Sequence, residues 1–378
     1  MKIIKKILVW LIGIVGLLVV LAYVFDVDYL FKAVRTIYLK GHTTAFLEDY
    51  KAFDNTTVKA KNEIAWPLHK HYNQIEATEK LKNAHEEYGT IAYLIIKNDS
   101  IFYEHYYDGF DQNSKSNSFS MAKSFVSGLL GKAIMDGYIK SLDQPLGDFF
   151  PKYKDTKTTV GDLASMASGL EWDERYYSPF SITTRAYFDD DLKEMMLNLD
   201  IVEEPGKEFK YLSGSTQLLA MVIEKASGKK LADYFSESFW QPLGAANDAL
   251  WQLDSKEHGL VKAYCCFASN ARDFARFGKL YKDHGNFNGQ QLLDSTFVAK
   301  SIRPRFKGAP YGYGMWLGDF NGKPFFSMRG HLGQYVIVVP DDNVMVVRLG
   351  HSRGPGGDRN AFPGSFLTFL EEAYKMME

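Results

Sequence analysis

The strongest hydrophobic pattern in the chain lies at its beginning. Three lysines among the first six residues precede residues 7–25, a run that contains no charged residue. At about 1.5 Å per residue, a helix of this run is roughly 29 Å long, close to the thickness of a bilayer core. The run ends in bulky side chains at residues 21–25, where a signal peptidase requires small ones. The pattern therefore predicts an uncleaved transmembrane anchor over residues 1–27; a cleaved signal peptide and a buried soluble helix are the alternatives.

The lysines before this run also predict its orientation. Positively charged residues stay on the cytoplasmic side of a membrane-spanning helix. We therefore expect a single-pass membrane protein that contacts the membrane through its N-terminal helix. The rest of the chain is expected outside the cytoplasm, in the bacterial periplasm. Residues 28–80 mix aromatic and charged segments. They are interpreted as a lead-in that links the anchor to the main body of the chain and packs on it.

From residue 81 onward the periodicity changes between strand-like and helix-like. Residues 90–96 and 101–107 are rich in β-branched and aromatic residues and flank a polar turn, which predicts a hairpin. A helix is expected from Ser120 to about residue 136, because Gly137 follows as a stop signal. Residues 138–300 are mostly helical in pattern, with helices expected at 190–198, 213–226 and 270–282 and a further one opening at 159–163.

The strand pattern returns after residue 305. Apolar runs separated by short turns are followed by an amphipathic helix over residues 363–377, and the runs occupy residues 311–317, 324–328, 335–339 and 344–349. Strands on both sides of a helical stretch favour one antiparallel sheet with that stretch inserted between its halves. The predicted fold class is thus α+β: an antiparallel sheet flanked by helices over residues 81–378, with a mostly helical insertion.

Composition narrows the class of protein. Hydrophobic residues make up 46% of the chain and charged residues 24%, which is typical of a globular protein. The net charge of −2 gives no electrostatic reason to expect nucleic acid as a partner. The two cysteines, Cys265 and Cys266, are adjacent and are interpreted as buried thiols, because a disulfide between neighbours closes a strained ring. Since they offer no metal-ligand spacing, neither metal nor cofactor is expected.

Two Ser-x-x-Lys tetrads are candidates for nucleophile chemistry. Ser120 and Lys123 lie at the start of an apolar helical pattern, and one helical turn brings them to the same face. A lysine that has lost its proton can take one from the serine hydroxyl. The second tetrad begins at Ser227, at a helix exit that Gly228 caps, so we interpret its lysines as solvated charges and reject it as a nucleophile.

Tyrosine residues near serines are candidates for a second proton-handling group. Tyr211 and Ser213 form a Tyr-x-Ser motif at the junction between a loop and an apolar helix, where a phenol can project into a cleft. The same pattern at Tyr234 lies in an amphipathic segment and is interpreted as core. Tyr176 lies in a loop and is a candidate for lining the substrate pocket.

A third polar element precedes an apolar strand near the end of the chain. It spans residues 329–335 and contains His331 and Gly333. Glycines in such a position allow a backbone N–H at the strand edge to face a ligand. A turn histidine without a role is the alternative reading of His331.

Together these elements resemble a known family. They follow the order and spacing of the three motifs of serine β-lactamases and penicillin-binding proteins, and the chain is most similar to the class C-type branch that includes esterases and 6-aminohexanoate-dimer hydrolases. The similarity covers residues 80–378 and rests on Ser120-Met121-Ala122-Lys123, Tyr211-Leu212-Ser213 and His331-Leu332-Gly333, with supporting stretches at 159–172 and 271–278.

The resemblance implies a role for each motif. Ser120 is the acylated nucleophile, Lys123 and Tyr211 share the acid and base work, and Ser213 completes the proton network. The backbone N–H groups of Ser120 and Gln334 form the oxyanion hole, and His331, Gly333 and Tyr176 contact the substrate.

The third motif departs from the family pattern. Members that act on β-lactams or peptidoglycan usually have a lysine where this chain has His331, and a hydroxyl residue where it has Leu332. A largely neutral histidine attracts a substrate carboxylate less strongly than a lysine does. We therefore expect a serine hydrolase of esters or small amides; β-lactamase or D-Ala-D-Ala peptidase activity is the alternative.

Two other readings compete with this one. Residues 350–354 match the Gly-x-Ser-x-Gly nucleophile elbow of α/β-hydrolases. That fold requires a helix after the serine and a later histidine, but Pro355, Gly356 and Gly357 follow and the chain has no histidine after His351. The other reading is a membrane-anchored binding or sensor domain that kept the fold and lost turnover. The complete Ser120, Lys123 and Tyr211 set argues against it.

Overall fold

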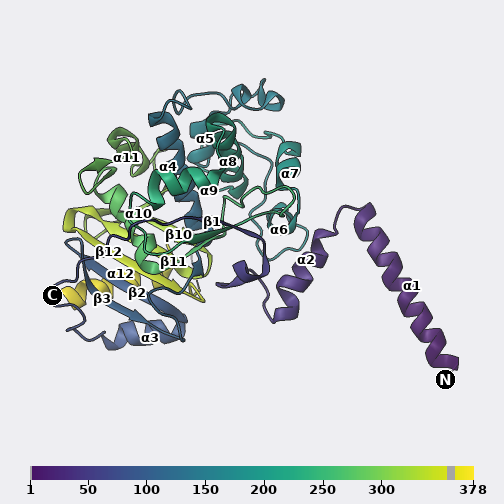
Figure 1. Cartoon of the computed structure of the whole chain (residues 1–378), viewed down its shortest axis with the longest axis horizontal. Helices are drawn as coiled ribbons and strands as arrows, with labels where there is room; N and C mark the ends of the chain where they lie inside the picture. Colours follow the sequence, from purple (N-terminus) through teal and green to yellow (C-terminus); the bar gives the residue numbers. More distant parts are fainter. Residues whose placement is uncertain (1, 356–361) are drawn as a thin grey trace.

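A six-stranded antiparallel sheet lies at the centre of the computed structural model, which describes residues 2–355 and 362–378 (Figure 1). Its strand order is β3-β2-β12-β11-β10-β9. The strands are β2 (Thr90–Lys97), β3 (Ser100–Tyr106), β9 (Trp316–Phe320), β10 (Lys323–Gly330), β11 (Gln334–Val339) and β12 (Val344–Gly350). Because β2 pairs with β12, the early hairpin and the late strands form one sheet, which confirms the predicted α+β fold.

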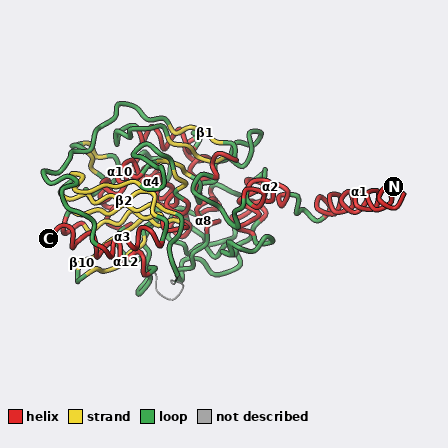
Figure 2. Tube along the Cα trace, turned by 90° about the horizontal axis from the view of Figure 1, so that it is seen from below, coloured by secondary structure: helices red, strands yellow, loops and turns green. Residues whose placement is uncertain are grey.

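Both faces of this sheet are covered by helices, so its strands are apolar on both sides. Tyr93 and Ile95 pack with α3 (Glu79–Glu87) and α12 (Gly364–Met377) on one face (Figure 2). Leu94 and Ile96 belong to the larger core on the other face. That core continues through α10 (Ala271–Lys282) into α4 (Ala122–Met135) and α8 (Ser213–Ser227).

The segment between the two halves of the sheet is mostly helical, as predicted. Its other α-helices are α5 (Val160–Ala164), α6 (Ile182–Phe188), α7 (Leu192–Asn198), α9 (Leu231–Phe235) and α11 (Ser295–Ser301). It also carries short strands. A second sheet has the order β1-β5-β6-β4 (Asn55–Val58, Ala249–Gln252, Phe267–Ser269, Ser116–Asn117), and β7 (Asn286–Phe287) pairs with β8 (Gln290–Gln291).

Single turns of 3₁₀- or π-helix complete the described elements. They are η1 (Tyr38–Lys40), η2 (Asp49–Ala52), η3 (Phe119–Met121), η4 (Leu146–Asp148), η5 (Pro151–Tyr153), η6 (Ser236–Trp240), η7 (His331–Gly333) and η8 (Pro340–Asp342). Of these, η3 and η7 matter most for function, because they contain the predicted nucleophile and the third motif.

Local capping explains where several helices begin and end. The side chains of Thr159, Asp191 and Asn270 accept hydrogen bonds from the first turns of α5, α7 and α10. Gly228 ends α8 in a left-handed conformation with φ of 69°. Ser227 therefore occupies a capped helix end, which confirms the predicted helix exit at the second Ser-x-x-Lys tetrad.

One predicted strand begins later than its sequence pattern indicated. Residues 311–317 were expected to be extended, but β9 starts at Trp316. Gly314 has φ of 81° and its N–H donates to the carbonyl of Ala164 at 3.1 Å. A Cβ at this position would lie 2.4 Å from that of Ser127, so the chain turns here against α4.

The prediction of two free thiols was wrong. Cys265 and Cys266 form a disulfide, with their Cα atoms 3.7 Å apart. Cys266 has a left-handed backbone with φ of 72°, and this turn allows the neighbouring sulfurs to meet. The nucleophile-elbow reading is not supported either, because residues 351–355 after β12 are not helical. Gly356 and Gly357 lie outside the described residues.

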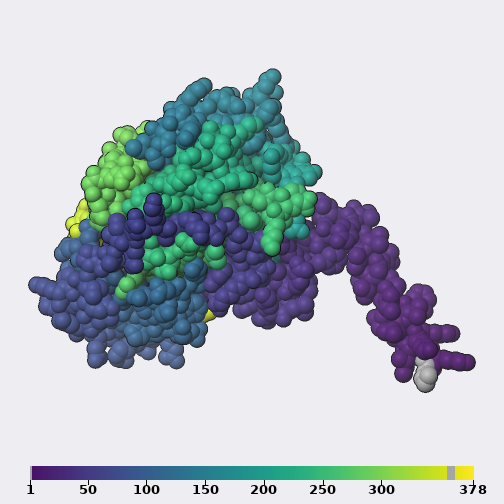
Figure 3. Space-filling model, in the orientation of Figure 1, coloured from purple at the N-terminus to yellow at the C-terminus, as the bar shows by residue number. Residues whose placement is uncertain are grey.

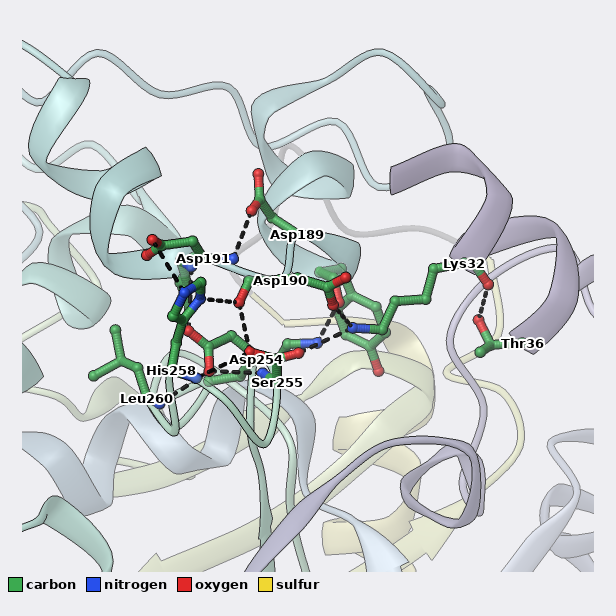
Figure 4. A network of polar contacts seen from close by, with 12 residues as sticks. Lys32, Thr36, Asp189, Asp190, Asp191, Asp254, Ser255, His258 and Leu260 are labelled. Carbon is green, nitrogen blue, oxygen red and sulfur yellow. Dashed lines mark hydrogen bonds and ion pairs between the residues drawn. The ribbon is translucent and has the colours of Figure 1, made fainter. Parts of the chain in front are cut away.

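The lead-in packs on the helical part of the body, whereas α1 (Lys2–Val24) projects away from it (Figure 3). Helix α1 is long and apolar enough to cross a membrane. Helix α2 (Tyr29–Thr36) follows and contacts α6. Lys32 Nζ extends from α2 to Asp190 Oδ1 at 2.5 Å and to the carbonyl of Asp254 at 2.9 Å (Figure 4). Strand β1 then joins the lead-in to the second sheet.

Substituting Phe125 tests the core that supports α4. Its side chain is fully buried, and its ring centroid lies 4.9–5.3 Å from those of Phe235, Phe267 and Phe277. Phe125→Ala is expected to lower the free energy of unfolding by about 3–5 kcal/mol, because it leaves a cavity that a packed core cannot close. Urea unfolding followed by tryptophan fluorescence measures this loss.

Phe180→Ala is the matched control for this substitution. Phe180 is 69% exposed, so its removal is expected to change stability by no more than about 0.5 kcal/mol. Equal losses in the two variants would contradict the proposed core.

Candidate active site

Ser120 lies in η3, the single turn that leads into α4. The residue before it, Phe119, has φ of 46°, a conformation that costs a non-glycine residue energy. The N–H of Ser118 donates to the carbonyl of Phe267 at 2.7 Å, and the N–H of Phe119 donates to Asn117 Oδ1 at 2.8 Å. These bonds hold the strained turn in place. Gly330, at the end of β10, lies so close to this turn that a Cβ would be 2.1 Å from the carbonyl oxygen of Ser118.

Lys123 contacts Ser120 as the tetrad predicted. Its Nζ donates to Ser120 Oγ at 2.9 Å and to the carbonyl of Tyr264 at 2.8 Å. The side chain is buried in α4. Burial lowers the pKa of Lys123 from its usual 10.5 to about 8, against the charge of Glu174, which favours the protonated form. A useful fraction of Lys123 is therefore neutral near pH 7–8 and can accept a proton from Ser120.

Tyr211 lies close to both Lys123 and Ser120. The Nζ of Lys123 is 5.1 Å from the centroid of the Tyr211 ring. Burial, together with the charge of Glu174, raises the pKa of Tyr211 well above its usual 10, although hydrogen bonding with Ser120 opposes this. The phenol is thus neutral at physiological pH and can donate a proton in a relay.

Glu174 is a site residue that sequence reasoning missed. Its carboxylate accepts from the backbone N–H of Ser213 at 2.9 Å, from the Ser213 hydroxyl and from Trp172 Nε1 at 2.8 Å. The hydroxyl of Tyr176 also donates to it. Glu174 lies in an irregular loop between α5 and α6, where no periodicity marks a functional side chain. It connects the Tyr176 loop to the start of α8.

His331 lies beside Ser120 at the turn between β10 and β11. Its ring stacks on Tyr176 with centroids 5.6 Å apart and meets Phe119 edge-on at 5.6 Å. Burial, with a smaller contribution from the charge of Arg353, lowers the pKa of His331 to about 4. The imidazole is therefore neutral at physiological pH, as its sequence context led us to expect.

Gly333 and Gln334 have structural surroundings that the sequence did not indicate. The carbonyl of Gly333 accepts from Arg348 Nη1 at 2.9 Å, and a Cβ on Gly333 would lie 2.4 Å from that nitrogen. Gln334 begins β11 fully buried, and its Nε2 donates to the carbonyl of Gly350 at 2.7 Å. Neither residue lines the cavities that meet at Ser120.

Two cavities share Ser120, Tyr176 and His331 in their walls. The narrow cavity has a volume of about 80 Å³ and is lined mainly by aromatic and small side chains of the lead-in and of residues 176–188. The wide cleft has a volume of about 960 Å³ and is also lined by Tyr211 and by charged residues, namely Glu174, Asp319, Arg329 and Arg353. Ser120, the predicted nucleophile, is thus accessible from two chemically different sides.

Among the described residues, one group has ligand atoms close enough to hold a metal ion. It consists of Asp191, Asp254 and His258, beside the contact of Lys32 with the body (Figure 4). Backbone N–H groups of Ser255 and Leu260 donate to Asp254 Oδ1 at 2.7 and 2.9 Å. None of the three lines either cavity, so this group acts as a loop anchor and not as part of the Ser120 site.

Sequence comparison finds curated relatives of this chain. A 6-aminohexanoate-dimer hydrolase of Paenarthrobacter ureafaciens is 26% identical over 226 residues, which is 56% of this chain and 57% of that protein. A D-aminopeptidase of Brucella anthropi is 25% identical over 237 residues, which is 57% of this chain and 44% of that protein. The chain thus matches about half the length of these curated relatives, and both names describe hydrolases.

A solved structure and a family model complete the comparison. A Bacillus anthracis protein, provisionally assigned as a 6-aminohexanoate-dimer hydrolase, superposes with a TM-score of 0.70 at 20% identity, covering 86% of this chain and 91% of that one. The model of the Beta-lactamase family matches residues 75–363, which include Ser120, Lys123, Tyr211 and His331. The chain therefore belongs to the Beta-lactamase family.

Proposed function

We propose that this protein is a membrane-anchored serine hydrolase that forms an acyl-enzyme on Ser120 and acts on esters or small amides. The observation that carries the proposal is the 2.9 Å contact between Lys123 Nζ and Ser120 Oγ. Burial makes Lys123 a base that is partly neutral near physiological pH, which is the property that an activating lysine requires.

The reaction proceeds in two halves. Neutral Lys123 takes the proton from Ser120, whose Oγ attacks the substrate carbonyl to form a C–O bond. The bond to the leaving group then breaks, and the proton passes from Lys123 through the Tyr211 hydroxyl to the departing oxygen or nitrogen. A water molecule next attacks the acyl-enzyme, releases the carboxylic acid and returns the proton to Ser120. Glu174 positions Ser213, and Ser213 completes the proton network.

The developing oxyanion requires two N–H donors, each worth about 3–4 kcal/mol of barrier. The N–H of Ser120 is one of them. The backbone N–H of Gln334, the first residue of β11 after the turn that carries His331, remains the predicted second donor.

A second candidate function is hydrolysis of D-amino-acid peptides. It is favoured by Arg329 and Arg353, whose positive charges line the wide cleft, where a substrate carboxylate can be attracted. The neutral His331 favours ester or small-amide substrates instead. The ratio of kcat/KM for p-nitrophenyl butyrate to that for a peptide ending in D-Ala-D-Ala, which carries a free carboxylate, decides between them.

Removing the nucleophile tests the proposal directly. Ser120→Ala is expected to abolish both p-nitrophenyl butyrate hydrolysis and labelling by a fluorophosphonate probe, since no acyl-enzyme can form. Ser227→Ala, in the other Ser-x-x-Lys tetrad, is the matched control and should keep both. Unchanged activity in Ser120→Ala would refute the mechanism, and labelling of the wild type without turnover of any substrate would favour a sensor domain.

The pKa of Lys123 predicts the pH dependence of acylation. The neutral amine is the active base, so the rate should rise with pH and level off above about pH 8. Roughly one molecule in a hundred has a neutral Lys123 at pH 6, and about half do at pH 8. Lys123→Arg, whose guanidinium stays protonated, should lower kcat/KM by about 100-fold or more and abolish the rise in rate between pH 6 and pH 8. If the variant keeps that rise, the rise belongs to the titration of another group.

Substituting Tyr211 tests the proton relay. Tyr211→Phe should lower kcat/KM for alkyl esters by about 100-fold or more, because an alkoxide must be protonated as it leaves. The loss for p-nitrophenyl esters should be about tenfold smaller, since p-nitrophenolate leaves without a proton. Tyr234→Phe, a core tyrosine, is the control. Equal losses for both ester types would show that Tyr211 does not serve the leaving group.

A further inference from the structure

The narrow cavity beside Ser120 is uncharged, in contrast to the wide cleft. Of the described residues that line it, none is Asp, Glu, Lys or Arg, and His331 is neutral. Several hydroxyl groups in its wall are engaged elsewhere. That of Thr184 donates to the carbonyl of Ser178 at 2.8 Å, and that of Tyr187 donates to Asp49. An uncharged cavity in which several polar groups are already engaged elsewhere favours an apolar ligand.

The few unpartnered polar atoms of this cavity belong to residues around the nucleophile. Tyr264 Oη and His331 Nε2 are buried and have no hydrogen-bond partner among the described residues. The Tyr264 ring lies 5.8 Å from Lys123 Nζ, and His331 packs against Phe119, the neighbour of Ser120. Polar groups are therefore available where the reacting carbonyl must lie.

The lead-in forms one wall of the narrow cavity. Ile37, Tyr38 and Ala45 line it from one side, and residues of the 176–188 segment line it from the other. The lead-in is held against this segment by Tyr29, whose hydroxyl donates to the carbonyl of Pro179 at 2.9 Å. Lys32 adds contacts to Asp190 and Asp254 nearby (Figure 4). The cavity thus depends on a segment that precedes the region matched by the family model.

The position of Tyr211 indicates which part of a substrate occupies which cavity. The group that protonates a leaving atom must lie within hydrogen-bonding reach of it. Tyr211 lines the wide cleft and does not line the narrow cavity. The leaving group therefore departs into the wide cleft, and the acyl group stays on the opposite side of Ser120.

We propose that the narrow cavity binds the apolar acyl chain of the substrate, so that the natural substrate is an amphiphile with an apolar acyl group and a polar leaving group. This inference rests on the proposed acyl-enzyme mechanism. At about 30 Å³ per water molecule, a volume of about 80 Å³ is room for roughly three waters, or for the three or so carbons next to the carbonyl, since a methylene and a water molecule are of similar size.

The outer end of the cavity is apolar as well. Tyr38 and Tyr177 line the cavity and are 49% and 68% exposed, so they mark where it opens. Their neighbours Leu39 and Phe180 are also largely exposed. Only α2 and short connections separate Tyr38 from α1, the candidate membrane span. An opening ringed by such side chains suits an acyl chain that arrives from an apolar phase.

The test uses the full chain in phospholipid nanodiscs and p-nitrophenyl acetate, hexanoate and dodecanoate. Ala45→Phe places a large side chain in the cavity wall and should lower kcat/KM for the hexanoate at least tenfold while changing that for the acetate less than threefold. Phe188→Leu enlarges the cavity with little structural cost and should raise the dodecanoate-to-hexanoate ratio at least threefold. Ala299→Phe, on α11 and away from both cavities, is the matched control. Thermal unfolding of each variant confirms that it is folded.

The outcomes separate this inference from the function on which it rests. If the wild type hydrolyses the esters through Ser120 but Ala45→Phe and Phe188→Leu leave the chain-length ratios unchanged, the acyl pocket is refuted and the hydrolase stands. If the wild type hydrolyses none of the esters, or if Ser120→Ala still does, the proposed function itself fails. With the pocket established, release of octanoate from dioctanoylglycerol in the nanodisc identifies the bilayer as the source, whereas hydrolysis of dissolved esters alone identifies the aqueous phase.

Discussion

The burial of one lysine is the constraint on which this site depends. Lys123 loses most of its contact with water in α4, and its Nζ donates hydrogen bonds to Ser120 Oγ and to the carbonyl of Tyr264. A charged amine in such surroundings is unfavourable, which is why its pKa falls to about 8. The aromatic core around Phe125 excludes water from the same helix. The packing that stabilises α4 is therefore also what makes Lys123 a base.

Several backbone turns around Lys123 have strained conformations, and hydrogen bonds from neighbouring side chains hold them in place. Phe119, Leu332 and Cys266 all have positive φ, and each lies next to a residue that borders Ser120 or lines its cavities. Such conformations persist only where the surroundings enforce them. Arg348, fully buried in β12, donates to the carbonyls of Leu332 and Gly333 and so fixes the turn that carries His331. Glu174 does the same for the start of α8.

The two sides of Ser120 differ because different parts of the chain build them. The wide cleft is formed by the late strands and by the loop before α8, and charged residues line it. The narrow cavity is closed by the lead-in, which packs through Tyr29, Ala33 and Ile37 against α6. A hydrolase with one charged and one uncharged side is suited to a substrate with a polar and an apolar part. The segment that follows α1 thus forms part of the wall beside Ser120 as well as connecting the body to α1, the candidate membrane span.

The sequence by itself determined the elements that rest on local rules. Period-two and period-3.6 patterns, together with caps such as Thr159 and Gly228, predicted most strands and helices, and Ser120, Lys123, Tyr211 and His331 were identified because they lie in short motifs. Only the tertiary structure decided the features that depend on contacts between distant segments. The role of Glu174 is one, because this residue lies in a loop without periodicity. The late start of β9 is another, because Gly314 turns against α4, and the Cys265–Cys266 disulfide requires a left-handed turn that no local pattern signals. The pairing of the lead-in with residues 176–188, more than a hundred residues away, created the narrow cavity, and only packing brings such segments together.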